Sequence, residues 1–370
     1  MKIIVLGTRG IPDILGGVET HCEELYPLLV KDWGHDITVI TRSCYITNTA
    51  QGVFNGIKLK KIYAPKNKTF EAIIHSVLSI LYAGLKRPDI VHIHAIGPCL
   101  VVPLARLLGL KVVMTHHGAD YKRKKWGRMA KFFLRVGEWA GVKFANKVIV
   151  ISEEISNDIQ KKYGRNDAVL IPNGVSIKGR PEHRKEVLDK YGLSKGHYIF
   201  SLGRFVPEKG FDYLINSFIN SGISNSYKLV IAGDADHESE YSLALKKHAE
   251  LSHVILPGFV KGEVLAQLFS NCALFILPSF YEGLPIALLE GMAYSLPILA
   301  SDIAANTQVG LPEKCYFPVG DENYLANKIA DLLNNETSEF YEYYDIDNYN
   351  WNRIAMLTDA VYLEFYSLKD

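Results

Sequence analysis

Residues 278–293 have the sequence PSFYEGLPIALLEGMA and follow the apolar run 273–277. This order predicts a strand, a glycine-bearing loop, and a helix that begins near Pro285, because proline is favoured at the first helical position. Seven residues separate two carboxylates, Glu282 in the loop and Glu290 in the helix. Glu290 falls among leucines, where a carboxylate without a partner would be costly to bury. It therefore either faces solvent or contacts a ligand hydroxyl.

The same alternation of apolar runs and helical spacing occupies both halves of the chain, which has 370 residues. Continuous apolar strands separated by helices indicate parallel sheets covered on both faces, as in Rossmann-like, doubly wound domains. The length suits two such domains. The expected strands are Lys2–Leu6, Ile37–Ile40, Ile57–Ile62, Ile90–Ile93, Lys111–Met114 and Lys147–Ile151, then Tyr198–Leu202, Lys228–Ala232, His253–Leu256, Ala273–Leu277 and Pro297–Ala300.

Turn-forming residues divide the two sets of strands. Residues 171–175 read IPNGV and residues 179–181 read GRP, and Pro and Asn-Gly are typical of turns. We therefore expect a first domain of residues 1–172, joined by an amphipathic C-terminal helix within 350–370, and a second domain of residues 173–349. Parallel sheets bind ligands outside the carboxyl ends of their strands, so the motifs that follow strands matter most.

Composition limits the classes of function. Lys plus Arg is 41 and Asp plus Glu is 40, a net charge of +1, so no global field attracts nucleic acid. The five cysteines form no CxxC, which indicates reduced thiols in a cytoplasmic protein. No apolar stretch reaches the roughly 18 residues of a membrane span. Disorder and a disulfide-dense scaffold are excluded by 48% hydrophobic residues.

The first strand is followed by two glycine-containing motifs, GTRG at 7–10 and GGVET at 16–20. The pattern is not GxGxxG, so the dinucleotide fingerprint is absent. Gly16 and Gly17 at a helix start would let backbone N–H groups approach an anion. A tight strand-to-helix turn explains the same residues equally well.

A second motif, GRFVPEKG at 203–210, follows the strand that ends at Leu202. Arg204 and Lys209 flank a turn into a helix, which is where a diphosphate could be held. Taken alone, solvated surface charge is the favoured explanation.

Two other patterns resemble metal sites. Asp234-Ala235-Asp236 is a literal DxD, and the histidines His92, His94, His116 and His117 fall near strand ends. No spacing such as HExxH completes a motif around the histidines, so packed or hydrogen-bonded histidines are favoured. The metal interpretation of the DxD is disfavoured because the two sheet domains and the E-x7-E spacing indicate another kind of site, so no metal is expected.

Residues 122–135 contain seven basic residues and no acid, with Trp126, Phe132 and Phe133 interleaved. The next acid is Glu138, so we expect no local compensation of this charge. A basic, aromatic and helical segment is typical of contact with anionic lipid. An exposed basic helix face is the alternative. Nucleic acid is disfavoured, because no recognition module accompanies the segment.

Together these motifs resemble the retaining glycosyltransferases of family 4, which have the GT-B fold. The opening residues 7–12 (GTRGIP) and 16–20, with 115–120 (THHGAD) and 124–126 (KKW), further resemble a bacterial rhamnosyltransferase-like subgroup of surface polysaccharide biosynthesis. The resemblance implies two Rossmann-like domains that face a cleft, with the nucleotide sugar bound by the second domain and the acceptor by the first.

The resemblance also implies roles for individual residues. Arg204 and Lys209 would hold the donor diphosphate, Glu282 would contact the donor sugar, and Glu290 would contact the ribose. Gly16 and Gly17 would face the phosphate and the reacting carbon from the first domain, and His117 would lie near the donor sugar. Backbone N–H groups in the segment Gly283 to Leu289, which includes Leu284, Pro285 and Leu288, would line the sugar and phosphate, and the base would lie near Phe259 and Val260.

The implied function is retaining transfer of a sugar from a nucleotide donor to a glycan or polyprenyl-linked acceptor, without a metal or other cofactor. The leaving diphosphate gains negative charge, which an Arg, a Lys and a helix N-terminus can stabilise. Attack on the face that the diphosphate leaves is favoured over a Glu282 nucleophile. A catalytically silent sugar-nucleotide binder and a nucleotide-cofactor oxidoreductase stay open as alternatives. The expected location is the cytoplasm, and the inner membrane face if residues 122–135 contact lipid.

Overall fold

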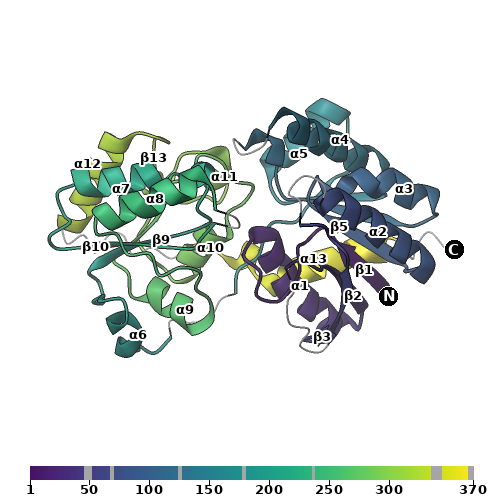
Figure 1. Ribbon diagram of the computed structural model, residues 1–370, viewed down its shortest axis with the longest axis horizontal. Helices are drawn as coiled ribbons and strands as arrows, with labels where there is room; N and C mark the ends of the chain where they lie inside the picture. Colours follow the sequence, from purple (N-terminus) through teal and green to yellow (C-terminus); the bar gives the residue numbers. More distant parts are fainter. Residues whose placement is uncertain are drawn as a thin grey trace. The chain divides into compact units, whose positions relative to one another are not determined.

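The structure is a computed structural model, and it describes residues 1–45, 52–66, 71–123, 127–176, 181–235, 238–334 and 344–365. The chain divides into two compact units (Figure 1). Unit 1 comprises Met1–Gly174 and Tyr349–Asp370, and unit 2 comprises Val175–Asn348. Each unit is built on its own parallel sheet, so the expected pair of Rossmann-like α/β domains is confirmed.

Unit 1 contains an eight-stranded sheet in the order β3-β4-β2-β1-β5-β6-β7-β8. All of its neighbouring strands pair in parallel except β3 and β4, which form an antiparallel pair at one edge. The strands are β1 (Lys2–Leu6), β2 (Asp36–Arg42), β3 (Val53–Phe54), β4 (Ile57–Ile62), β5 (Ile90–His94), β6 (Val112–His116), β7 (Lys147–Val150) and β8 (Val169–Leu170).

Helices cover both faces of this sheet. Those of unit 1 are α1 (Gly17–Trp33), α2 (Glu71–Lys86), α3 (Val102–Leu107), α4 (Arg128–Phe144), α5 (Glu153–Tyr163) and α13 (Trp351–Leu363), with short 3-10 turns η1 (Pro98–Val101) and η2 (Asp120–Lys122). A further 3-10 turn, η6 (Asp347–Tyr349), spans the point in the sequence where unit 2 ends and unit 1 resumes. The C-terminal helix α13 packs on α1, and its Ile354 and Val361 join Leu25 and Leu29 in one buried cluster with the strands. This packing makes α13 part of unit 1.

Unit 2 contains a five-stranded parallel sheet in the order β10-β9-β11-β12-β13. The strands are β9 (Tyr198–Leu202), β10 (Lys228–Ala232), β11 (Leu274–Leu277), β12 (Ile298–Ser301) and β13 (Tyr316–Phe317). The helices are α6 (Lys185–Asp189), α7 (Phe211–Asn220), α8 (Glu240–Leu251), α9 (Gly262–Ser270), α10 (Ile286–Ala293), α11 (Ala304–Thr307) and α12 (Glu322–Asn334), with 3-10 turns η3 (Pro207–Lys209) and η4 (Glu313–Cys315).

The expected strand at 253–256 is wrong. Ile255 makes only an isolated bridge with Val230 beside the β10 edge. Pro257 follows two residues later and has no N–H to continue a ladder, so the chain leaves the sheet there. Among the described residues, no helix is both long enough and apolar enough to cross a bilayer.

Candidate functional site

The carboxyl ends of β9 and β10 approach each other so closely that glycine is required. Gly233 has a φ of +124°, and a Cβ atom there would lie 1.9 Å from the carbonyl oxygen of Gly203. Beyond this contact, the Phe205 amide donates to the Asp234 carbonyl at 3.0 Å. The loop that contains Arg204 is therefore fixed against the end of β10, at the sheet edge where ligands of such folds bind.

Lys209 is held beside the end of β11. Gly210 has a φ of +65°, and a Cβ there would lie 2.4 Å from the Pro278 carbonyl oxygen. The Tyr213 hydroxyl donates to the same oxygen at 2.6 Å. Lys209 Nζ then reaches Glu282 Oε1 at 2.5 Å, and the pair is largely buried, with side chains 17% and 12% exposed. The structure therefore brings together two residues that the sequence placed in separate motifs.

Glu282 receives a second hydrogen bond. The Ser279 hydroxyl donates to the same Oε1 atom at 2.7 Å. The Ser279 carbonyl in turn accepts a hydrogen bond from the Ser301 hydroxyl at 2.5 Å, which ties the loop to β12. One oxygen of the Glu282 carboxylate is thus occupied by two donors from the protein.

Helix α10 begins after Pro285, close to where the sequence predicts it. The backbone amides of Leu288 and Leu289 donate to the Pro285 carbonyl at 3.1 and 3.4 Å, and both side chains are buried. These two amides already have a partner within the helix. The start of the helix lies in Gly283 to Ala287, which is the earlier part of the segment expected to line the phosphate. Glu290 lies half-buried further along α10.

The residues expected near the base follow β10. The Gly233 amide donates to the Gly258 carbonyl at 2.8 Å, which brings residues 258–260 beside the strand end. Phe259 is 46% exposed and Val260 is buried. An exposed aromatic ring at this edge is suited to stacking on a base, and that role stays a prediction.

The sequence indicated no role for Glu208. It lies between Pro207 and Lys209 in η3 and is buried, and neither carboxylate oxygen has a hydrogen-bond partner among the described residues. No local pattern distinguishes a buried glutamate from the many exposed ones.

The DxD motif places one carboxylate in an ion pair. Asp234 Oδ1 lies 2.8 Å from Lys246 Nζ on α8. Burial alone would raise the pKa of Asp234, but Lys246 and the Ala235 amide hold that pKa below its ordinary value. Asp236 lies outside the described residues.

In unit 1, an ion pair links the two glycine-containing motifs, GTRG at 7–10 and GGVET at 16–20. Arg9 Nε lies 3.1 Å from Glu19 Oε1, and both side chains are nearly buried. Burial alone would raise the pKa of Glu19, but the Arg9 guanidinium and its hydrogen bonds lower it below the ordinary value. A Cβ on Gly16, whose φ is +150°, would lie 2.2 Å from Glu19 Oε2, so this position favours glycine for packing as well as backbone reasons. No pattern in the sequence indicated a role for Arg9 or Glu19.

His117 ends a chain of hydrogen-bonded rings in unit 1. His117 Nε2 lies 2.9 Å from His94 Nδ1, and His94 Nε2 lies 2.5 Å from the Tyr26 hydroxyl. His92 Nδ1 lies 2.6 Å from the Tyr362 hydroxyl and 3.1 Å from the Tyr26 hydroxyl. Burial lowers the pKa of His92 to about 3, and lowers the pKa of His94 and His117 well below 6.5. The imidazoles are therefore neutral at pH 7.

We assign the protons of this chain by taking His92 as the tautomer that donates from Nε2 to Thr115 Oγ1, 2.7 Å away, so that its Nδ1 accepts. His92 Nδ1 has one lone pair, and the shorter contact gives it to the Tyr362 hydroxyl. Tyr26 then donates to His94 Nε2, and His94 donates from Nδ1 to His117 Nε2. In this assignment His117 carries its proton on Nδ1.

His21, His94 and His117 also form a cluster whose ring nitrogens lie within 4.8 Å of one another. His21 Nδ1 contacts Asn173 Oδ1 at 3.1 Å, and burial lowers the pKa of His21 to about 4. The rings of His94 and His117 are only 28° from parallel and their centroids are 5.2 Å apart. This arrangement matches an in-line hydrogen bond between the two nitrogens, whereas ligands of one metal ion converge on a shared point.

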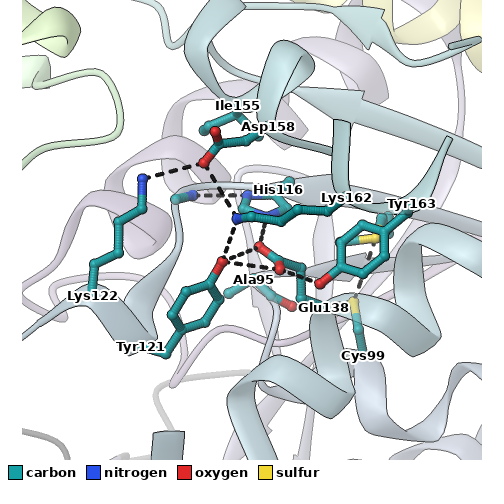
Figure 2. A network of polar contacts seen from close by, with 12 residues as sticks. Ala95, Cys99, His116, Tyr121, Lys122, Glu138, Ile155, Asp158, Lys162 and Tyr163 are labelled. Atoms are coloured by element: carbon teal, nitrogen blue, oxygen red, sulfur yellow. Dashed lines mark hydrogen bonds and ion pairs between the residues drawn. The ribbon is translucent and has the colours of Figure 1, made fainter. Parts of the chain in front are cut away.

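His116 belongs to a different network, around the buried Glu138 of α4 (Figure 2). His116 Nε2 lies 3.0 Å from Glu138 Oε1, and the hydroxyls of Tyr121 and Tyr163 donate to the carboxylate at 3.1 and 2.5 Å. Lys162 Nζ donates to the Tyr121 hydroxyl at 2.8 Å. The network joins the end of β6 to η2, α4 and α5. It connects residues far apart in sequence, so spacing gave no signal for it.

Family models match both units of the chain. The description "Glycosyltransferase Family 4" matches residues 15–178, and "Glycosyl transferases group 1" matches residues 183–351. Two similar proteins are uncharacterized glycosyltransferases of Methanocaldococcus jannaschii. One is 29% identical over 67% of this chain and 66% of its own length, and the other is 24% identical over 98% of each chain. An amylovoran biosynthesis glycosyltransferase of Erwinia amylovora is 24% identical over 78% of this chain and 77% of its own.

Solved structures show the same fold. Sucrose-phosphate synthase from Thermosynechococcus elongatus superposes with a TM-score of 0.82 at 20% identity, and covers 99% of both chains. Anabaena HepE in complex with UDP-glucose has a TM-score of 0.79 at 16% identity, over 98% of this chain and 99% of its own. The fold is therefore GT-B, and the chain is a glycosyltransferase of that type. The two family models identify it further as a glycosyltransferase of the family 4 type.

Proposed function

We propose that this glycosyltransferase transfers a sugar, with retention of configuration, from a nucleotide-sugar donor to a glycan or polyprenyl-linked acceptor in surface polysaccharide biosynthesis. The observation that carries the proposal is the Lys209–Glu282 pair at the carboxyl edge of the unit 2 sheet, beside the start of α10. The structural neighbour that binds UDP-glucose and the relative named for amylovoran biosynthesis support the donor and acceptor classes.

In this proposal unit 2 binds the donor. Lys209 gives one of its three N–H donors to Glu282, which leaves two for the diphosphate. Arg204 and the N-terminus of α10 add positive potential where the leaving group gains charge. Glu290 contacts the ribose, and Phe259 and Val260 contact the base.

Glu282 acts as a positioning group. Its Oε1 atom accepts from Lys209 and Ser279, so Oε2 is the oxygen that can accept from a sugar hydroxyl. A carboxylate held by a lysine is a weakened nucleophile, because the ion pair stabilises the charge that would attack. Attack of the acceptor on the face that the diphosphate leaves is therefore the route we propose.

Unit 1 supplies the second set of residues. With its proton assigned to Nδ1, neutral His117 donates to a sugar hydroxyl, and Gly16 and Gly17 offer backbone close to an anion. We propose that no metal takes part, because the leaving diphosphate has Lys209, Arg204 and a helix start to stabilise it, and Asp234 is paired with Lys246.

The test is turnover with a panel of UDP-, GDP- and dTDP-sugars, dTDP-rhamnose included, and lipid-linked acceptors, with and without EDTA. We expect one donor to be consumed at equal rates in both conditions, and NMR of the product to show the anomeric configuration of the donor. An inverted product would contradict retention. Loss of turnover in EDTA, restored by a divalent ion, would contradict metal independence. A donor that binds but is never consumed with any acceptor would favour a silent sugar-nucleotide binder.

A further inference from the structure

One face of unit 1 has an unusual surface. The crossovers from β4 to β5, from β5 to β6 and from β6 to β7 all run in one direction along the sheet, so right-handed connections place α2, α3 and α4 on the same face. The helix α3 lies against both α2 and α4 (Figure 1). The helices α1 and α13 lie on the opposite face, where the core is closed by α13.

The outer surface of these three helices exposes large apolar side chains. On α2, Ile74, Leu78, Leu81 and Leu85 follow a helical line, and Leu85 is 85% exposed. Leu107, at the end of α3, is also 85% exposed. The exposed apolar residues of α4 are Met129, Phe132, Trp139 and Phe144. We call these nine residues, with the exposed cations described next, the α2–α4 face.

The charge of the α2–α4 face has one sign. Its exposed cations are Lys86, Arg87, Arg106, Arg128, Arg135 and Lys143. The acids within α2, α3 and α4 are Glu71 and Glu138, and both are buried. Glu71 pairs with Arg42 at 2.8 Å, and Glu138 pairs with His116. In the described part of these helices, apolar and cationic side chains are therefore exposed together and no acid is.

The segment before α4 differs from its sequence expectation. Lys122 lies 3.5 Å from Glu154 and 3.2 Å from Asp158, both on α5 (Figure 2 shows the contact with Asp158). Arg123 lies 3.1 Å from Asp120. The expectation that no acid offsets this charge is wrong for these two residues, because folding brings α5 beside Lys122 and the turn η2 places Asp120 beside Arg123. Residues 124–126 lie outside the described residues.

We propose that the α2–α4 face docks unit 1 on a bilayer that contains anionic lipid. An anionic bilayer accounts for both the exposed cations and the exposed apolar side chains of this face. Its headgroups attract the cations, and its acyl boundary accepts the leucines and aromatic rings. A second copy of this chain fits less well, because it would place cations against cations over the same area. The docking requires neither the nucleotide donor nor turnover, so it stands apart from the proposed function.

The experiment is co-sedimentation of the full chain with vesicles of phosphatidylglycerol and phosphatidylcholine, and with vesicles of phosphatidylcholine alone. We expect binding to the first at low salt and a large decrease with added salt or without phosphatidylglycerol. The triple variant Leu81→Gln/Leu85→Gln/Leu107→Gln should lower the partition coefficient at least tenfold. The matched control Leu243→Gln/Leu251→Gln changes exposed leucines of α8 in unit 2 and should bind as the wild type does.

Three outcomes would overturn the proposal. One is a wild-type protein that ignores phosphatidylglycerol vesicles at low salt. Another is a triple variant that binds vesicles as well as the wild type does, while the variant Lys122→Gln/Arg123→Gln does not bind them. That result would assign the lipid contact to the segment before α4. The third is a lipid-free dimer, seen by light scattering, that the triple variant converts to monomer, which would assign the face to a second copy. Far-ultraviolet circular dichroism and thermal denaturation check that each variant is folded.

Discussion

Lys209 Nζ lies 2.5 Å from Glu282 Oε1, although 73 positions separate the two residues in the chain. The contact joins the turn after β9 to the loop after β11, which are neighbouring strands of the unit 2 sheet. It fixes a cation at the sheet edge and occupies one oxygen of the carboxylate. Two of the residues with proposed roles in transfer therefore depend on each other's position.

The first prediction concerns the charge of Lys209. Lys209→Ala removes a cation that the proposal aims at the leaving diphosphate, so the barrier should rise by about 3 kcal/mol, which is roughly a hundredfold in kcat. The matched control is Lys246→Ala, which breaks a more exposed ion pair in the same unit and should leave kcat nearly unchanged. A folded Lys209→Ala protein with wild-type kcat would show that the assignment to the diphosphate is wrong.

The second prediction concerns the turn that positions Lys209. Gly210→Ala places a methyl group 2.4 Å from the Pro278 carbonyl, so the turn must move away from β11. We expect lower thermal stability and a fall in kcat together. Gly222→Ala is the control, since Gly222 also has a positive φ but its Cβ would meet no atom within 4 Å. It should lose only about 1 kcal/mol of stability and no activity. Equal effects of the two variants would mean that contact with Pro278 does not position the turn.

The third prediction concerns Arg9 and Glu19. Arg9→Met leaves a buried carboxylate without its cation, which should lower the free energy of unfolding by about 3 kcal/mol or more. Lys58→Met, which breaks the exposed pair with Asp36, should cost less than about 1 kcal/mol. Urea denaturation followed by tryptophan fluorescence measures both.

The same pair makes a prediction about acid. The folded pKa of Glu19 lies below the unfolded value of 4.5, so its contribution to stability is complete above that pH and is lost as the pH falls through the folded pKa. The stability difference between the wild type and Glu19→Gln should be constant at pH 6–8 and should shrink below about pH 4.5. A stability difference that does not change with pH would contradict the Arg9–Glu19 ion pair.

Strand positions were predictable where apolar residues recur through the strand, as a nearly continuous run in β1, β9 and β10 and at intervals in β4. The expected bounds of β1, β4, β9 and β10 agree with the structure at both ends. The two-residue strands β3, β8 and β13 were missed, because at such lengths pairing with a neighbour decides the conformation and no apolar run marks it.

The candidate site was predictable as motifs but not as contacts. The order of strand, loop and helix indicated Arg204, Lys209, Glu282 and Glu290, because ligands bind where parallel strands end. The pairing of Lys209 with Glu282 depends on the packing of Gly210 against Pro278, which no local pattern records. The histidine chain likewise needs α1, β5, β6 and α13 in place before its rings meet.

The last prediction concerns that histidine chain. Burial lowers the pKa of His21 to about 4 and of His92 to about 3, whereas both are near 6.5 in the unfolded chain. Below pH 6.5 the unfolded state therefore binds protons that the folded state does not. The stabilising effect of the neutral rings is complete above about pH 6.5 and is lost as the pH falls toward the folded values. Each such histidine contributes a slope of up to about 1.4 kcal/mol per pH unit.

The slope can be measured in unit 1 alone, because all four tryptophans (Trp33, Trp126, Trp139 and Trp351) belong to that unit. Urea denaturation followed by tryptophan fluorescence should show stability falling between pH 6.5 and 5.5, a window above the range where most carboxylates titrate. His92→Gln removes one titrating ring. It should reduce the slope of stability against pH by up to about 1.4 kcal/mol per pH unit, which corresponds to one proton, whatever it does to stability at pH 7. His248→Gln in unit 2 should leave the slope unchanged. Equal slopes for the wild type and His92→Gln would mean that His92 is protonated in the folded protein, and the proton assignment that gives His117 its Nδ1–H would then be wrong.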